Sequence, residues 1–116
     1  MDAETGKPCT DFGDNGQVDI KQNMGKTPAG YVSINSAPVI VDGVLVTGHQ
    51  VLDGQRRYPP SGVIKGFDAV TGELEWAWDA GRPDQSEPLS GDETYVRGSP
   101  NMWTTAVGDN LSLIHI

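Results

Sequence analysis

The feature that constrains the fold of this chain most is a short internal repeat. The pattern Asp-x-x-Thr-Gly stands at residues 2–6 and returns 66 residues later, at residues 68–72. The Asp and Thr side chains of such a pattern accept hydrogen bonds from nearby backbone amides, and Gly adopts positive φ without a steric cost. Each copy is therefore predicted to form a tight turn at the tip of a hairpin of antiparallel strands.

A different turn pattern lies between the two copies. Residues 37–41 and 44–48 are rich in Val and Ile, and they flank the pair Asp42-Gly43. Asp-Gly between two such runs favours a type I′ turn, in which both central residues have positive φ. This part of the chain predicts a hairpin of its own.

Strand-like segments also surround the second copy of the repeat. Residues 62–67 lead into it, and residues 73–78 lead out with polar and apolar side chains in alternation. The polar residues 49–61 join the two hairpins and are predicted to be a loop. Together the hairpins occupy residues 36–78, and these 43 residues are the length of one four-stranded blade of a β-propeller.

Composition narrows the functional classes. The 116 residues include 15 Gly and 8 Pro, which indicates one turn-rich, all-β domain at most. With 8 basic and 16 acidic residues the net charge is -8, so phosphate backbones and anionic lipid surfaces repel the chain and nucleic acid is an unsuitable partner. The apolar runs are far shorter than the ~20 residues that span a bilayer. The single cysteine, Cys9, cannot form an intrachain disulfide.

Five stretches of the chain resemble one family. Residues 16–20, 36–40, 61–68, 71–79 and 99–103 are similar to the quinoproteins that bind pyrroloquinoline quinone (PQQ), and above all to the membrane-bound glucose dehydrogenases. The resemblance implies an eight-bladed β-propeller, of which this chain supplies roughly two blades as a fragment. Residues 1–110 are expected to form this partial propeller domain. Residues 111–116 depart from the family pattern and are expected to be a non-native tail.

The resemblance also implies an activity for the parent protein. The family oxidises an aldose, such as glucose, at C1 to the lactone and passes the electrons to ubiquinone, at the periplasmic face of the inner membrane. Membrane attachment is expected through a region of the parent protein outside this chain. The catalytic base and other cofactor ligands of the family lie in blades that this chain lacks. We therefore assign no catalytic residue here and expect the isolated fragment to be inactive.

A tryptophan is the candidate cofactor residue. Trp103 follows Ser-Pro-Asn-Met and matches the position at which the family places a tryptophan against the PQQ ring. A flat, polarisable indole suits a planar tricyclic ring, although a tryptophan packed between blades is the structural alternative. Trp76 and Trp78 stand on the outgoing strand of the second hairpin and are expected to be structural.

The candidate metal ligand is Asp53, which matches an acid that the family associates with Ca²⁺ or Mg²⁺, ions that prefer oxygen ligands. Gly54 stands where the family has Asn, so that a solvated Asp-Gly turn is an alternative. His49 and His115 lack partners at metal-ligand spacing.

A second interpretation of the whole chain is a non-catalytic propeller scaffold of the kind that assists outer-membrane protein assembly. The run at residues 61–68, Trp103 and the Asp53 loop favour the enzyme.

Overall fold

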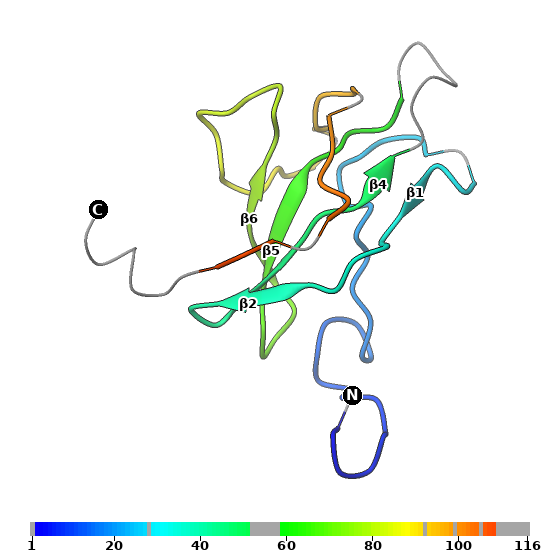
Figure 1. The fold of residues 1–116 in the computed structure, drawn as a ribbon, viewed down its shortest axis with the longest axis vertical. Coiled ribbons are helices and arrows are strands. Elements are labelled where there is room, and N and C mark those ends of the chain that lie inside the picture. Colours follow the sequence, from blue (N-terminus) through cyan, green and yellow to red (C-terminus); the bar gives the residue numbers. More distant parts are fainter. Residues whose placement is uncertain are drawn as a thin grey trace.

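The computed structural model describes residues 2–27, 29–51, 59–91, 93–98, 100–104 and 106–108. Over these residues the regular structure consists of strands, and no helix is present that is long and apolar enough to cross a membrane. The predicted all-β class is confirmed. The strands are β1 (Val32–Ser33), β2 (Val39–Val41), β3 (Val44–Thr47), β4 (Gln50–Val51), β5 (Ile64–Asp68) and β6 (Leu74–Trp78), several of which are labelled in Figure 1.

Four of the strands form the predicted blade. The sheet has the antiparallel order β2-β3-β5-β6, and one row of backbone partners crosses all four strands: Val39, Val46, Gly66 and Trp76. Asp42 and Gly43, between β2 and β3, have φ values of 51° and 75°. Both are positive, as a type I′ turn requires. The two hairpins at residues 36–78 are therefore confirmed, together with their antiparallel arrangement.

The middle of the sheet depends on a glycine. Gly66 on β5 pairs with Trp76 on β6, and a Cβ at residue 66 would overlap the Trp76 indole. The ring therefore lies directly over the backbone of β5. The register of the two strands shifts between Gly66 and Phe67, as at a β-bulge. Trp76 thus packs inside its own blade, in agreement with a structural role.

A second, smaller sheet corrects one prediction. β1 and β4 pair antiparallel, with Val32 opposite Val51 and Ser33 opposite Gln50. Residues 49–61, predicted to be a loop, thus contain a strand at Gln50–Val51. The sequence could not reveal it, because two residues are too few to show the alternation that identifies a strand.

The N-terminal segment packs on the blade without forming strands of its own before β1. Residues 7–9, after the first copy of the repeat, form no strand. The turn itself is closed by a hydrogen bond of 2.8 Å from the Asp2 amide to the Lys7 carbonyl oxygen. Because the incoming strand of this hairpin would precede Asp2, the hairpin at the first copy stays a prediction. Farther along, the fully buried Met24 joins a small core with residues of the blade and of the segment after it. This core comprises Met24, Val63, Ala77 and Tyr95, with Val32 and Leu89 packed against it.

A buried lysine ties the N-terminal segment to the blade. Lys65 on β5 is 2% exposed, and its Nζ donates hydrogen bonds of 2.8 Å to the carbonyl oxygens of Ile20 and Gln22. The same Nζ lies 5.3 Å from the centre of the Tyr95 ring. Burial lowers the pKa of Lys65 to about 8, while the nearby Asp19 carboxylate opposes the shift. The ammonium is thus held by neutral oxygen and ring partners.

Candidate functional site

The candidate site lies at one end of the blade, where a later segment of the chain crosses the strand ends. Because the sheet is an antiparallel meander, the start of β2, the end of β3, the start of β5 and the end of β6 lie at the same end. A segment from the C-terminal part of the chain runs past these strand ends in the order β6, β5, β3, β2 (orange in Figure 1). We call its described residues, 95–98 and 100–104, the crossing segment.

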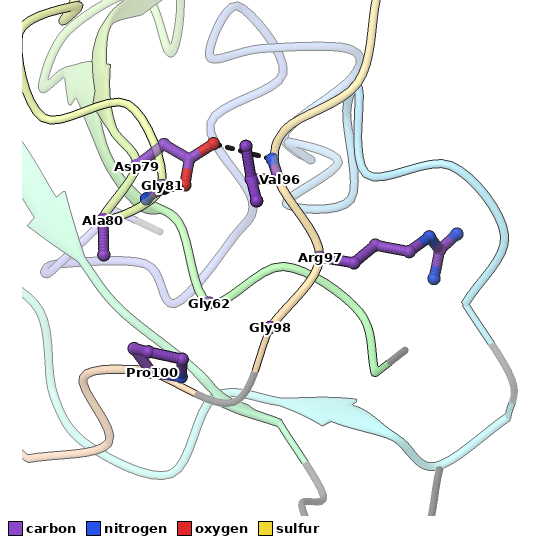
Figure 2. Close-up of a pocket in the computed structure, with 8 residues that line it drawn as sticks. All are labelled: Gly62, Asp79, Ala80, Gly81, Val96, Arg97, Gly98 and Pro100. Carbon is purple, nitrogen blue, oxygen red and sulfur yellow. Dashed lines mark hydrogen bonds between the residues drawn. The ribbon is translucent and has the colours of Figure 1, made fainter. Parts of the chain in front are cut away.

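The crossing segment is first held at the end of β6. Asp79 follows the last residue of β6, and its buried carboxylate accepts two backbone hydrogen bonds. Oδ1 accepts from the Gly81 amide at 2.9 Å, and Oδ2 accepts from the Val96 amide at 2.7 Å. The second bond is marked in Figure 2. Asp79 therefore closes a local turn and fastens the crossing segment to the blade with the same carboxylate.

Two glycines let the crossing segment approach the next strand ends closely. A Cβ at Gly62, before β5, would overlap the Pro100 carbonyl, and a Cβ at Gly48, after β3, would overlap the backbone of Met102. Any larger residue at either position requires the backbone to shift. Glycine at these positions is thus needed for close contact between two backbones, a use of glycine at strand ends that needs no special φ.

The crossing segment reaches Trp103 at the start of β2. The Ser36 hydroxyl, three residues before β2, donates a hydrogen bond of 2.6 Å to the Trp103 carbonyl oxygen. The Trp103 residue itself is 58% exposed. The sequence-predicted cofactor residue therefore has a fixed backbone and a largely open side chain, and this arrangement leaves the indole accessible to a flat partner.

A buried histidine supports the strand ends that the crossing segment contacts. His49 adjoins Gly48, and its Nε2 lies 2.9 Å from the Ser61 carbonyl oxygen, next to Gly62. Because a carbonyl only accepts, Nε2 carries the proton. Burial lowers the pKa of His49, which favours the neutral imidazole, although its bond to Ser61 acts in the opposite direction. His49 joins the end of β3 to the start of β5 and has a structural role.

A cavity of about 200 Å³ lies between the crossing segment and the end of β6. Figure 2 shows its lining: Gly62, Asp79, Ala80, Gly81, Val96, Arg97, Gly98 and Pro100. The Arg97 guanidinium points away from the other lining residues in this view, and its Nη2 donates a hydrogen bond of 2.7 Å to the Lys26 carbonyl oxygen. The cavity is therefore bordered mainly by backbone and small side chains, and its one carboxylate is already occupied by two amides.

The predicted metal ligand lies outside the described residues. Asp53 and Gly54 follow β4, which ends at Val51. In the sequence they lie five residues after Gly48 and His49, respectively, which the structure does describe. Within the described ranges, no cluster of three His, Cys, Asp or Glu side chains is placed to hold a metal ion. The tail predicted at residues 111–116 and its boundary at residue 110 also lie outside them. The roles of Asp53 and of the tail stay predictions.

Most of the groups that hold Trp103 have no signal in the sequence. The sequence pattern predicts no role for Asp79, and it places Ser36, Gly48 and Gly62 only at the borders of predicted strands and hairpins. The available signal was the presence of Gly at both ends of the 49–61 connection, since a glycine beside a strand often marks a close backbone approach. Which segment approaches could not be inferred, because Trp103 is 67 residues from Ser36 in the sequence.

Comparison with known proteins places the chain in a family. The family model described as "PQQ: Glucose/ethanol/alcohol dehydrogenase, beta-propeller domain" matches residues 1–115. The glycerol dehydrogenase large subunit of Gluconobacter oxydans (strain 621H) is 47% identical over 117 residues, which cover 100% of this chain and 16% of that protein. The quinoprotein glucose dehydrogenase of Escherichia coli (strain K12) is 38% identical over 117 residues, covering 100% of this chain and 15% of that protein.

A third relative widens the range of substrates in these names. The quinate/shikimate dehydrogenase (quinone) of Acinetobacter baylyi is 38% identical over 104 residues, which cover 89% of this chain and 13% of that protein. No solved structure matches the chain significantly. The chain spans only about one sixth of the length of its first two relatives. The four-stranded antiparallel blade is the structure expected of a β-propeller, in agreement with the family match over residues 1–115. The chain belongs to the β-propeller domain family of the PQQ-dependent glucose, ethanol and alcohol dehydrogenases.

Proposed function

We propose that the protein containing this chain is a PQQ-dependent dehydrogenase and that Trp103 provides one face of its cofactor site. The observation that carries this proposal is the open Trp103 indole on a backbone held by Ser36. A residue that is 58% exposed in this chain contributes little to the core that these residues form, and an open indole at a fixed position suits stacking on a flat ring. The cofactor supplies the redox chemistry when bound, and the chain supplies a surface that orients it.

The proposed reaction removes two electrons and two protons from a carbon that carries a hydroxyl group. The C–H and O–H bonds break and a carbonyl forms; bound PQQ would accept the two electrons and two protons, and a quinone such as ubiquinone would be the final acceptor of both. With an aldose oxidised at C1, the product is the lactone. We place this reaction at the periplasmic face of the inner membrane, with attachment through a part of the protein outside this chain.

The substrate class follows from the relatives only in broad terms. The quinoprotein glucose dehydrogenases support an aldose such as glucose, whereas the more similar relative, at 47% identity, is named for glycerol. We therefore propose a polyhydroxylated substrate, with glucose and glycerol as its two candidates. Oxidation rates of the full-length protein with each compound, measured with an artificial electron acceptor, distinguish them.

A divalent ion completes the proposed site. Asp53 supplies a carboxylate for Ca²⁺ or Mg²⁺. Gly54 lacks the side-chain oxygen of the Asn that the family has at this position, so water or a residue of another blade supplies that ligand. In the full-length protein, Asp53→Asn should raise the Ca²⁺ concentration needed for half-maximal PQQ binding. Asp14→Asn, at an exposed acid near the N-terminus, serves as the control.

The test of the cofactor face is a PQQ titration of the full-length protein with added Ca²⁺. Trp103→Ala should weaken PQQ binding by about 1 to 3 kcal/mol, the range seen when aromatic stacking on nucleic-acid bases is removed. Trp103→Phe should lose less, because part of the flat face remains. Trp76→Ala should lower the melting temperature through lost packing on Gly66 and leave the affinity of the folded protein nearly unchanged. A parent protein that takes up no PQQ would favour the scaffold interpretation.

A further inference from the structure

The hydrogen bond between Ser36 and Trp103 joins the start of the blade to the end of the crossing segment. The Ser36 Oγ and the Trp103 carbonyl oxygen are 2.6 Å apart, at the short end of the range for a hydroxyl donor. Ser36 is half-buried, whereas its neighbours Asn35 and Ala37 are exposed. The hydroxyl therefore lies at the border of the sheet and contacts a backbone atom of the residue proposed to stack on the cofactor.

An exposed side chain depends on its backbone for its position. With 58% of its surface open in this chain, Trp103 gains little orientation from packing against the other described residues. A hydrogen bond to its carbonyl restrains the peptide plane at residue 103 and thereby the direction of the Cα–Cβ bond. Binding sites need such restraint, since a stacking group displaced by a fraction of an ångström loses contact with its ligand.

Three other contacts between the crossing segment and the ends of the blade strands act differently. Gly62 and Gly48 permit Pro100 and Met102 to come close, but a glycine has no side chain with which to hold them. Asp79 does attract the segment, at Val96, seven residues before the tryptophan. Among the described residues, Ser36 has a side-chain hydrogen bond to residue 103 itself.

We propose that Ser36 is a positioning residue for the cofactor face: its hydroxyl fixes the backbone of Trp103 so that the indole is already in place before the quinone binds. The role in quinone binding rests on the proposed function. The fixed position of the indole does not, because it is a property of the unliganded protein.

The experiment uses the full-length protein labelled with 5-fluorotryptophan. The ¹⁹F resonance of Trp103 is assigned by its loss in Trp103→Phe, and PQQ affinity is measured with added Ca²⁺. Ser36→Ala should shift or broaden the Trp103 resonance without cofactor and weaken PQQ binding about five-fold, the equivalent of losing one ordinary hydrogen bond. Ser36→Thr keeps a hydroxyl and should restore both properties. Ser33→Ala, at an exposed serine on β1, is the matched control.

Each result decides the matter. An unchanged Trp103 resonance in Ser36→Ala overturns the positioning role, as does a shifted resonance with unchanged PQQ affinity. Equal effects of Ser33→Ala and Ser36→Ala also overturn it, because they would show a general disturbance of this edge. Absence of PQQ uptake by every form refutes the proposed function, while the fluorine spectra still support or refute the restraint of Trp103 by Ser36.

Discussion

The two copies of the repeated turn have the same local structure and different surroundings. In residues 2–7, Asp2 Oδ1 accepts hydrogen bonds from the amides of residues 4 and 5, at 2.8 and 3.2 Å. In residues 68–73, Asp68 Oδ1 accepts from the amides of residues 70 and 71, both at 2.8 Å. The glycines at the ends of the two patterns, Gly6 and Gly72, have φ values of 70° and 79°. The five-residue pattern is therefore sufficient to form the turn.

The two turns differ in what lies against them in this chain. The second turn joins β5 and β6, and the Gly13 amide donates a hydrogen bond of 2.7 Å to the Thr71 carbonyl oxygen. Gly6, in contrast, has no neighbouring atoms within 4 Å of the position of a Cβ. After the first turn come Pro8 and polar residues, which lack the alternation seen at residues 73–78. A turn is encoded locally, whereas a strand needs a partner and an apolar face.

The largest expected effect comes from removing the link between the N-terminal segment and the blade. Lys65→Met in the full-length protein removes the donor to the carbonyls of Ile20 and Gln22 and leaves both oxygens without this partner. We expect a loss of about 2 to 4 kcal/mol in stability, since each hydrogen bond from a charged donor contributes about 1.5 to 3 kcal/mol. Hydrogen exchange should speed up at residues 14–27 more than in β5 and β6.

Lys65→Arg serves as the control for charge, because it keeps a donor at the end of a long side chain. Unchanged exchange at residues 14–27 in Lys65→Met would show that the N-terminal segment is ordered independently of the blade.

A matched pair of substitutions tests the two turns themselves. Ala at φ near +70° costs about 1 to 2 kcal/mol, so Gly6→Ala and Gly72→Ala share a backbone penalty. At residue 72 the new Cβ would also lie 2.8 Å from the Gly13 nitrogen, which is too close. We expect Gly72→Ala to destabilise the full-length protein by about 2 to 3 kcal/mol in total, and Gly6→Ala by less, because a Cβ at residue 6 meets no atom of this chain within 4 Å. Equal changes in melting temperature would contradict this difference.

The sequence predicted the parts of the fold that depend on neighbours in the chain. Asp42-Gly43 and the second Asp-x-x-Thr-Gly pattern specify their turns through side-chain hydrogen bonds and positive φ, and both hairpins were found. The pairing of β1 with β4 was missed, because it joins two short segments without periodicity. The burial of Lys65 could not be predicted either, since it depends on carbonyl oxygens more than 40 residues away.

In the candidate site, too, features that depend on distant contacts could not be predicted from the sequence. The resemblance to quinoproteins pointed to Trp103, but the groups that hold it act through distant contacts that no local pattern reports. The Ser36 bond and the close approaches at Gly48 and Gly62 exist only once the crossing segment lies across the strand ends.

A third aspartate sharpens the comparison of exposed turns. Asp79 bonds to the amide two residues later, as Asp2 and Asp68 do, but it is buried, and its second oxygen holds Val96. Asp79→Asn replaces one acceptor oxygen with a donor that faces an amide. We expect a loss of about 1 to 2 kcal/mol in the stability of the full-length protein. The Trp103 fluorine resonance should also broaden, because the crossing segment is released at one end.

The control is Asp14→Asn, at an exposed position near the N-terminus. If Asp79→Asn unfolds at the same denaturant concentration as the parent protein, the bond to Val96 contributes nothing to stability.

The smallest expected effect is a difference in acid sensitivity between the two exposed turns. Hydrogen bonds from the amides of Thr71 and Val70 lower the pKa of Asp68 below its ordinary value of 3.8, and those from Glu4 and Thr5 lower the pKa of Asp2. A lowered pKa in the folded state means that the folded protein binds fewer protons than the unfolded chain as the solution becomes acidic. The stabilisation is therefore fully present above the ordinary value and is lost as the pH falls through the lowered one.

Melting temperatures of the full-length protein between about pH 5 and about pH 3 measure this loss, over the range in which an aspartate with a lowered pKa takes up its proton. Asp68→Asn should be less stable than the parent at the upper end and should lose less on acidification, because its amide does not titrate. Asp2→Asn should follow the parent more closely, since Gly6 has no neighbouring atoms within 4 Å of the position of a Cβ, whereas Gly72 lies against Gly13 and Val18. Parallel curves for the parent and Asp68→Asn would show that the charge of Asp68 does not stabilise the hairpin. A flatter curve for Asp2→Asn than for Asp68→Asn would reverse the ranking of the two turns.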